Sequence, residues 1–259
     1  MTTKSLLING WRTISNSSPA THWNWPTFSP SPARNLSSAQ TAFAFVPSSL
    51  SLASTPTVTF TQDGDRYSWV PAQGGATTGV IVYPGAKVPP AAYGPLAQAI
   101  AGEGYLVEIV AMPLNLAVLG IGRADETIEA HPEIQHWVIA GHSLGGSMGA
   151  QFASDHLDVI DGLVFWASYA TLDLSATDLA VLSIWGSLDA GAGRMGGPEA
   201  RSAVPPDALF IEIEGGNHEQ MGWYTGQPND PPATISRADQ QRQVAGATVA
   251  LLDSLEPPI

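Results

Sequence analysis

The sequence predicts an α/β fold with a mostly parallel sheet of eight strands, an antiparallel hairpin at its start and helices on both faces. Two β-prone runs, 58–62 and 66–70, flank Asp63-Gly64-Asp65, which is typical of a hairpin turn. Six short and almost continuously apolar runs follow, as expected for strands buried on both faces of a parallel sheet. Stretches with helical character separate several of these runs, which is the alternation of an α/β layer fold.

The six apolar runs lie between residues 79 and 214, and they read GVIVY (79–83), YLVEIV (105–110), WVIA (137–140), LVFWA (163–167), VLSIW (181–185) and LFIEIE (209–214). Helices are expected near 91–102, 121–130, 144–156 and 236–255. The last one opens with Ser236 and has Asp239 three residues later, a variant of the capping-box pattern. We therefore expect one main domain over residues 57–259.

Residues 1–56 differ from the rest in composition. They are rich in Ser, Pro and Asn, which favours irregular structure. They also carry aromatic residues, among them Trp11, Trp23 and Trp25. Because disordered segments are poor in aromatic residues, we expect an N-terminal arm packed on the main domain.

Composition excludes several classes of function. The 259-residue chain has a net charge of −13 with only ten Lys and Arg, which argues against binding nucleic acid. It has no Cys, so disulfides, thiolate metal sites and cysteine nucleophiles are excluded. No run of eighteen apolar residues is present, and the start MTTKSLLINGW lacks a signal-peptide core. We expect a cytoplasmic protein, with a secreted mature form and the oligomeric state left open.

A candidate nucleophile lies directly after the apolar run 137–140. The segment Gly141-His142-Ser143-Leu144-Gly145 has the G-x-S-x-G pattern, in which a sharp strand-to-helix turn exposes a serine hydroxyl. Glycines flank the serine because its neighbours at such a turn must lack bulky side chains. The helix that follows directs free N–H groups and the positive end of its dipole to the same place. We therefore predict Ser143 as a nucleophile.

A serine hydroxyl needs an adjacent base, and the base needs a carboxylate that orients it. His218 follows the last apolar run, where strand ends of an open α/β sheet meet a site. Asp189 follows the preceding run in the same way and is the favoured acid. Asp173 and Asp178, which follow the run 163–167, remain alternatives.

Acyl transfer develops a negative charge on oxygen, which needs two fixed N–H donors. One donor is expected from Leu144, the residue after the nucleophile. The other is expected from the loop Tyr83-Pro84-Gly85-Ala86-Lys87, where Gly85 lets the backbone approach a substrate and Ala86 donates its amide hydrogen. The sequence thus predicts an oxyanion hole made by Ala86 and Leu144.

Candidate substrate-binding residues surround these groups. Gly85 and His142 adjoin the predicted donors and nucleophile. Met221, Trp223 and Tyr224 follow His218 closely and could form an apolar wall for the acyl or alcohol part of a substrate. Ordinary packing of these side chains is the alternative.

Four motifs recur in order: YPGAKV (83–88), MPLNLA (112–117), AGHSLGG (140–146) and GGNHEQMGWY (215–224). With them the chain resembles a bacterial branch of the α/β-hydrolase superfamily over roughly residues 57–255. The resemblance implies the α/β-hydrolase fold and a Ser-Asp-His hydrolase carried on Ser143, Asp189 and His218, in the chain order of that superfamily. Many relatives insert a helical lid between the sixth and seventh strands. Here only residues 168–180 join them, so we expect no large lid and an open site roofed by 217–235.

Together, these observations predict a serine esterase that cleaves a small-molecule carboxylic ester through an acyl-enzyme, with no cofactor and no metal. Lactonase, thioesterase, polyester hydrolase and acyltransferase activities fit the same groups. A catalytically inactive binding module is the alternative from another class. A dehalogenase or epoxide hydrolase with an Asp nucleophile is disfavoured because Ser occupies the turn.

Overall fold

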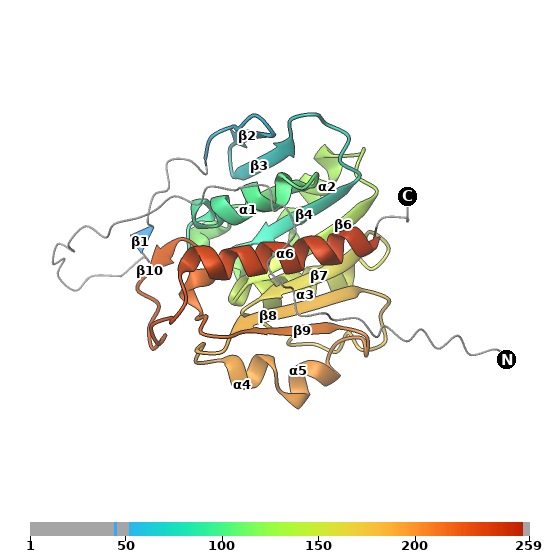
Figure 1. Cartoon of the computed structure of the whole chain (residues 1–259). Coiled ribbons are helices and arrows are strands. Elements are labelled where there is room, and N and C mark those ends of the chain that lie inside the picture. The colour runs from blue at the N-terminus through green and yellow to red at the C-terminus, as the bar shows by residue number, and fades with distance from the viewer. Residues whose placement is uncertain (1–43, 46–51, 256–259) are drawn as a thin grey trace, which may run out of the picture.

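The computed structural model describes residues 44–45 and 52–255 and shows a sheet of eight strands with helices on both faces (Figure 1). The strand order along the sheet is β2-β3-β5-β4-β6-β7-β8-β9. The bounds are β2 (Val58–Asp63), β3 (Arg66–Pro71), β4 (Thr78–Tyr83), β5 (Leu106–Val110), β6 (His136–His142), β7 (Ile160–Trp166), β8 (Ala180–Gly186) and β9 (Leu209–Ile213). Each of the eight predicted strands is present.

Pairing within the sheet follows the predicted pattern. β2 and β3 form an antiparallel hairpin, and β3 is also antiparallel to β5. The strands from β5 to β9 pair in parallel throughout. Every residue of the neighbouring strands β4 and β5 is buried, because both faces of the sheet are covered by helices.

Two helical layers cover the sheet. α1 (Gly94–Ala101) and α6 (Arg237–Leu255) pack against each other on the face nearer the viewer in Figure 1. On the other face, α3 (Leu144–Asp155) and α2 (Ala124–Ala130) share a second apolar cluster with β4 and β6. The predicted helices at 121–130, 144–156 and 236–255 correspond to η4 (Ile121–Arg123) with α2, to α3 and to α6.

Several short helices were not predicted. α4 (Ala192–Met195) and α5 (Pro198–Ser202) follow β8 and lie beyond the β9 edge of the sheet. Each spans about one turn among closely spaced glycines, so it presents no apolar periodicity. The predicted helix at 91–102 starts as the 3₁₀ helix η1 (Pro90–Tyr93) before α1, and further 3₁₀ turns are η2 (Pro113–Asn115), η3 (Ala117–Leu119) and η5 (Glu219–Met221).

The connection between β7 and β8 runs over residues 167–179 without a helix, in agreement with the expected lack of a large lid. Of the predicted N-terminal arm, residues 1–43 and 46–51 lie outside the described residues. β1 (Ala44–Phe45) pairs antiparallel with β10 (Tyr224–Thr225). No helix in the described ranges is long and apolar enough to cross a lipid bilayer.

The parallel strands bring their carboxyl ends to one edge of the sheet, on the left in Figure 1. The loops that follow β4, β6, β8 and β9 leave the sheet at this edge. All three residues of the predicted triad and both predicted oxyanion donors lie on or directly after these loops. The topology therefore gathers residues that are distant in sequence.

Candidate active site

Ser143 connects the central strand β6 to α3 and has a strained backbone, with φ 53° and ψ −124°. A positive φ is uncommon for a residue with a side chain, and the surroundings must hold it in place. The N–H of Ser143 donates to the carbonyl of Trp166 (3.1 Å), and the hydroxyl of Ser168 donates to the carbonyl of Ser143 (2.6 Å). The turn is therefore fixed on both sides by the end of the neighbouring strand β7.

Gly145 brings the start of α3 into contact with the end of β4. A Cβ atom at Gly145 would lie 2.1 Å from the carbonyl oxygen of Tyr83, a distance that no side chain can occupy. The first N–H groups of a helix have no acceptor within the helix, so the amide of Leu144 is available as a donor. This close approach brings the first turn of α3 against Tyr83 and Pro84, where the loop 84–88 begins.

His218 and Asp189 come from the loops after two adjacent strands, β9 and β8. Nδ1 of His218 lies 2.6 Å from Oδ2 of Asp189, and the Asp189 side chain is buried. The other carboxylate oxygen, Oδ1, accepts the N–H of Gly191 (2.7 Å). A carboxylate in this position fixes the proton of His218 on Nδ1 and leaves Nε2 to accept a proton.

The alternative acids Asp173 and Asp178 are both exposed, and neither forms an ion pair with a histidine among the described residues. Asp173 is exposed, and its carboxylate accepts the N–H and the hydroxyl of Ser175. Three further histidines, His131, His136 and His156, lie beside carboxylates away from these loops. Among the described residues, the contact between His218 and Asp189 is the one histidine–carboxylate pair at the loops after β8 and β9.

The loop 84–88 presents one free amide. The N–H of Lys87 donates to the carbonyl of Asn115 (2.7 Å), and the N–H of Val88 donates to the carbonyl of Gly85 (3.1 Å). The N–H of Gly85 donates to the hydroxyl of Tyr93 (2.9 Å). No acceptor among the described residues takes the N–H of Ala86. The amide of Ala86, which the sequence predicts as an oxyanion donor, is thus the N–H of this loop that has no acceptor among the described residues.

The residues suggested for substrate binding are mostly enclosed. His142 is buried, with its ring centroid 4.6 Å from that of His218 and 5.9 Å from that of Tyr224. Met221 and Tyr224 have no exposed surface, and Trp223 retains 5 %. Contact between these three side chains and a substrate would therefore require the segment 219–225 to move.

A family model described as alpha/beta hydrolase family matches residues 79–242, more than half of the chain. The chain belongs to the alpha/beta hydrolase family. The match runs from β4 into α6 and includes the elbow at Ser143 and the loops that carry Asp189 and His218. In a comparison with curated proteins, no sequence matches the chain.

Two residues of this alpha/beta hydrolase that the sequence did not indicate as functional hold the loop that carries His218. Asp230 accepts the backbone N–H groups of His218 (3.1 Å) and Glu219 (2.8 Å). Burial raises the pKa of Asp230, while these two N–H groups act in the opposite direction. Arg237, at the start of α6, donates to backbone carbonyls of the segment 219–225. Nothing local distinguishes either residue, because Asp230 lies in a Pro-rich loop and Arg237 in a predicted helix.

Two hollows lie near this region of the hydrolase. The larger, of about 620 Å³, is bounded by the segment 169–173 and by residues of α4 and α5, including Arg194. Its lining includes none of the predicted site residues.

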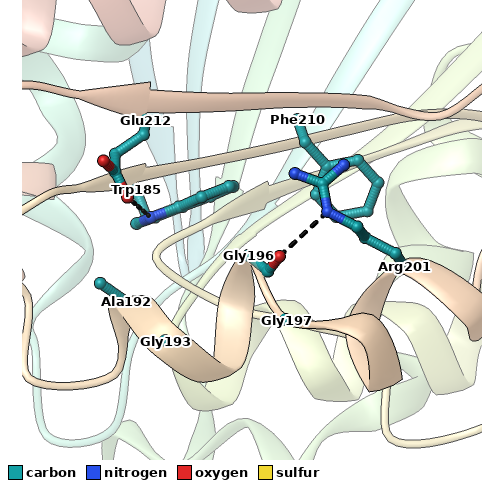
Figure 2. A pocket seen from close by; sticks show the side chains of 8 residues that line it. All are labelled: Trp185, Ala192, Gly193, Gly196, Gly197, Arg201, Phe210 and Glu212. Atoms are coloured by element: carbon teal, nitrogen blue, oxygen red, sulfur yellow. Dashed lines mark hydrogen bonds between the residues drawn. The ribbon is translucent and has the colours of Figure 1, made fainter.

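The smaller hollow, of about 410 Å³, lies between strands β8 and β9 and the helices α4 and α5 (Figure 2). Trp185 donates from Nε1 to Glu212 (3.0 Å), and the guanidinium of Arg201 lies 4.2 Å from the ring centroid of Phe210. Its lining also includes none of the predicted site residues. We therefore assign no part of the reaction to either hollow.

Proposed function

We propose that the protein hydrolyses carboxylic esters of small molecules through an acyl-enzyme, with Ser143 as nucleophile, His218 as base and Asp189 as the orienting acid. The proposal is carried by the 2.6 Å contact between His218 and Asp189, at the sheet edge where Ser143 lies on its strained turn. A hydroxyl on such a turn, an oriented imidazole and fixed N–H donors are the groups that acyl transfer requires.

In the proposed reaction, Oγ of Ser143 attacks the ester carbonyl carbon while Nε2 of His218 takes the hydroxyl proton. The N–H groups of Leu144 and Ala86 stabilise the charge on the carbonyl oxygen. The tetrahedral intermediate expels the alcohol, which receives the proton from His218. Water then attacks the acyl carbon while His218 takes its proton, and the second tetrahedral intermediate releases the acid as His218 returns that proton to Oγ of Ser143. Asp189 stays ionised and stabilises the imidazolium.

Two measurements test the proposed function: labelling with a fluorophosphonate, and hydrolysis of p-nitrophenyl esters from acetate to palmitate beside lactones, thioesters and polar aryl esters. Ser143→Ala should lose labelling and about 10⁶ in kcat while remaining folded. Ser154→Ala is the matched control, because its hydroxyl caps a carbonyl within α3 far from the elbow. If the wild-type protein cleaved lactones or thioesters faster than esters, the substrate class would change while the acyl-enzyme mechanism stayed the same.

Two outcomes would contradict the proposal. A Ser143→Ala protein that kept more than a tenth of the wild-type rate would remove the nucleophile. A wild-type protein that neither labelled nor cleaved any substrate would favour a binding module instead.

A further inference from the structure

The loop 84–88 is held in one orientation by a fully buried tyrosine that the mechanism above does not use. Tyr93 ends η1, directly before α1, and its ring stacks on that of Trp166 with centroids 6.4 Å apart. Its hydroxyl accepts the N–H of Gly85 at 2.9 Å. Pro84 has no N–H, and the N–H of Lys87 donates to the carbonyl of Asn115. Because Tyr93 accepts the N–H of Gly85, the amide of Ala86 is the remaining N–H in residues 84–87 that can bind an oxyanion.

The second partner of the Tyr93 hydroxyl is His142, the residue before the nucleophile. Nδ1 of His142 lies 2.7 Å from the Tyr93 oxygen. A hydroxyl has one proton to donate, and the contact with Gly85 uses an acceptor lone pair. The Tyr93 proton remains to be donated, and Nδ1 of His142 accepts it when the imidazole proton is on Nε2. In that tautomer the hydrogen bonds run in one direction, from the Gly85 amide to Tyr93 and from Tyr93 to His142.

The environment keeps both side chains uncharged. Burial raises the pKa of the Tyr93 hydroxyl, so it retains its proton. Burial lowers the pKa of His142 well below its usual range, and the charge of the neighbouring His218 lowers it further, while the backbone of His218 acts in the opposite direction. A neutral His142 with its proton on Nε2 has Nδ1 free to accept, which is the form that the Tyr93 hydroxyl needs.

Gly85 is what allows this contact. A Cβ atom at position 85 would lie 2.6 Å from Nδ1 of His142 and 3.1 Å from the Tyr93 hydroxyl, so a side chain there would separate the loop from the pair. The ring of His142 also packs on that of His218. The predicted oxyanion loop, the residue before the nucleophile and the base thus meet around two buried side chains.

We propose that Tyr93 is a positioning residue of the oxyanion hole. Its hydroxyl, which is hydrogen-bonded to His142, fixes the Gly85 peptide so that the loop directs the Ala86 N–H at the oxyanion. The inference rests on the proposed function, because it concerns the same acyl transfer. Its effect belongs to the transition state, in which the oxygen carries charge, more than to the bound substrate.

Tyr93→Phe removes the hydroxyl and keeps the ring. We expect kcat for p-nitrophenyl acetate to fall 10- to 100-fold while KM changes less than threefold. The affinity for a trifluoromethyl ketone, which forms an oxyanion on the enzyme, should fall by a similar factor. Tyr105→Phe is the matched control: it also removes a partly buried hydroxyl bonded to a side chain, here the carboxylate of Asp253 near the end of α6. It should lower thermal stability without lowering kcat.

Variants of His142 separate positioning from packing. The side-chain oxygen of Asn can take the place of Nδ1 and accept the Tyr93 hydroxyl, whereas Phe cannot. His142→Asn should therefore recover at least tenfold of the kcat that His142→Phe loses. Tyr93→Phe combined with His142→Phe should cost little more than either change alone, since both break the same contact.

The outcomes separate this inference from the function on which it rests. An active wild type with a Tyr93→Phe variant of unchanged kcat and unchanged ketone affinity overturns the inference alone. The inference is also overturned if Tyr93→Phe lowers kcat but leaves the ketone affinity unchanged. The same holds if Tyr105→Phe lowers kcat as much as Tyr93→Phe does, because Tyr93 would then have only a structural role. A wild type that neither labels with fluorophosphonate nor cleaves esters refutes both.

Discussion

Oδ1 of Asp230 accepts the backbone N–H of His218 at 3.1 Å, so the base is held through its main chain as well as through its ring. The second carboxylate oxygen of Asp230 accepts the N–H of Glu219 at 2.8 Å. The loop after β9 is therefore fixed at the residue that carries the imidazole.

Asp230→Asn should weaken this anchor. An Asn side chain offers one acceptor oxygen and turns its NH₂ group toward the other amide, which leaves one N–H without a partner. We expect kcat to fall about tenfold, equivalent to about 1.4 kcal/mol of transition-state stabilisation. Steady-state kinetics with p-nitrophenyl acetate measure this. Asp155→Asn, which alters an exposed carboxylate that accepts Gln151, is the control. Equal rates for the two variants would contradict the anchoring role.

Asp189→Asn should impair the reaction far more. An amide cannot stabilise the imidazolium and favours the wrong tautomer of His218, so kcat should fall by roughly 10⁴ with the fold intact. The control is Asp173→Asn, which changes an exposed alternative acid after β7. The measurement is kcat for hydrolysis of a p-nitrophenyl ester by each variant. If Asp173→Asn were the more damaging substitution, the acid would be misassigned.

Arg237 joins α6 to the segment 219–225 by donating to the carbonyls of Glu219 (2.8 Å), Gly222 and Tyr224 (3.0 Å). Arg237→Lys cannot reproduce this planar fork of donors, and it leaves buried carbonyls without partners. We expect a loss of about 1–3 kcal/mol in the free energy of unfolding, measured by urea denaturation. Arg242→Lys, at an exposed pair with Asp239, should change stability by less than about 0.5 kcal/mol. Similar losses for both would show that the contacts of Arg237 contribute little.

His142 should make stability depend on pH. Its pKa in the folded protein is well below the usual value, whereas in the unfolded chain it is about 6.5. Below that pH the unfolded chain binds a proton that the folded protein does not, so the free energy of unfolding falls as pH falls. A single group contributes up to about 1.4 kcal/mol per pH unit. Above pH 6.5 this contribution should not vary.

Comparison with His142→Asn isolates that contribution, since the other histidines are common to both proteins. The difference in unfolding free energy between wild type and variant should shrink as pH falls below 6.5. NMR provides a direct check: the His142 ring should remain neutral at pH 5 with its proton on Nε2. A ring that titrates near pH 6.5 would contradict the prediction.

Local sequence determined the elements of this protein. Alternating β-prone residues around Asp63-Gly64-Asp65 specify a hairpin, and short apolar runs specify strands covered on both faces, because each pattern reflects burial along one segment. The strand, G-x-S-x-G turn and helix around Ser143 are likewise contiguous. Helices α4 and α5 were not predicted, because a helix of about one turn is too short to show a periodic pattern of apolar residues.

Contacts between distant segments were decided only by the tertiary structure. Asp173, Asp178 and Asp189 all follow apolar runs, and the pairing of β8 with β9 is what sets Asp189 against His218. Tyr93 and Asp230 carry no local signal, since a buried helix residue and an acid in a Pro-rich loop look the same whether or not they meet a site. Sequence patterns record how each segment is buried. Which side chains meet at the carboxyl edge of the sheet depends on strand order and register, which are properties of the whole chain.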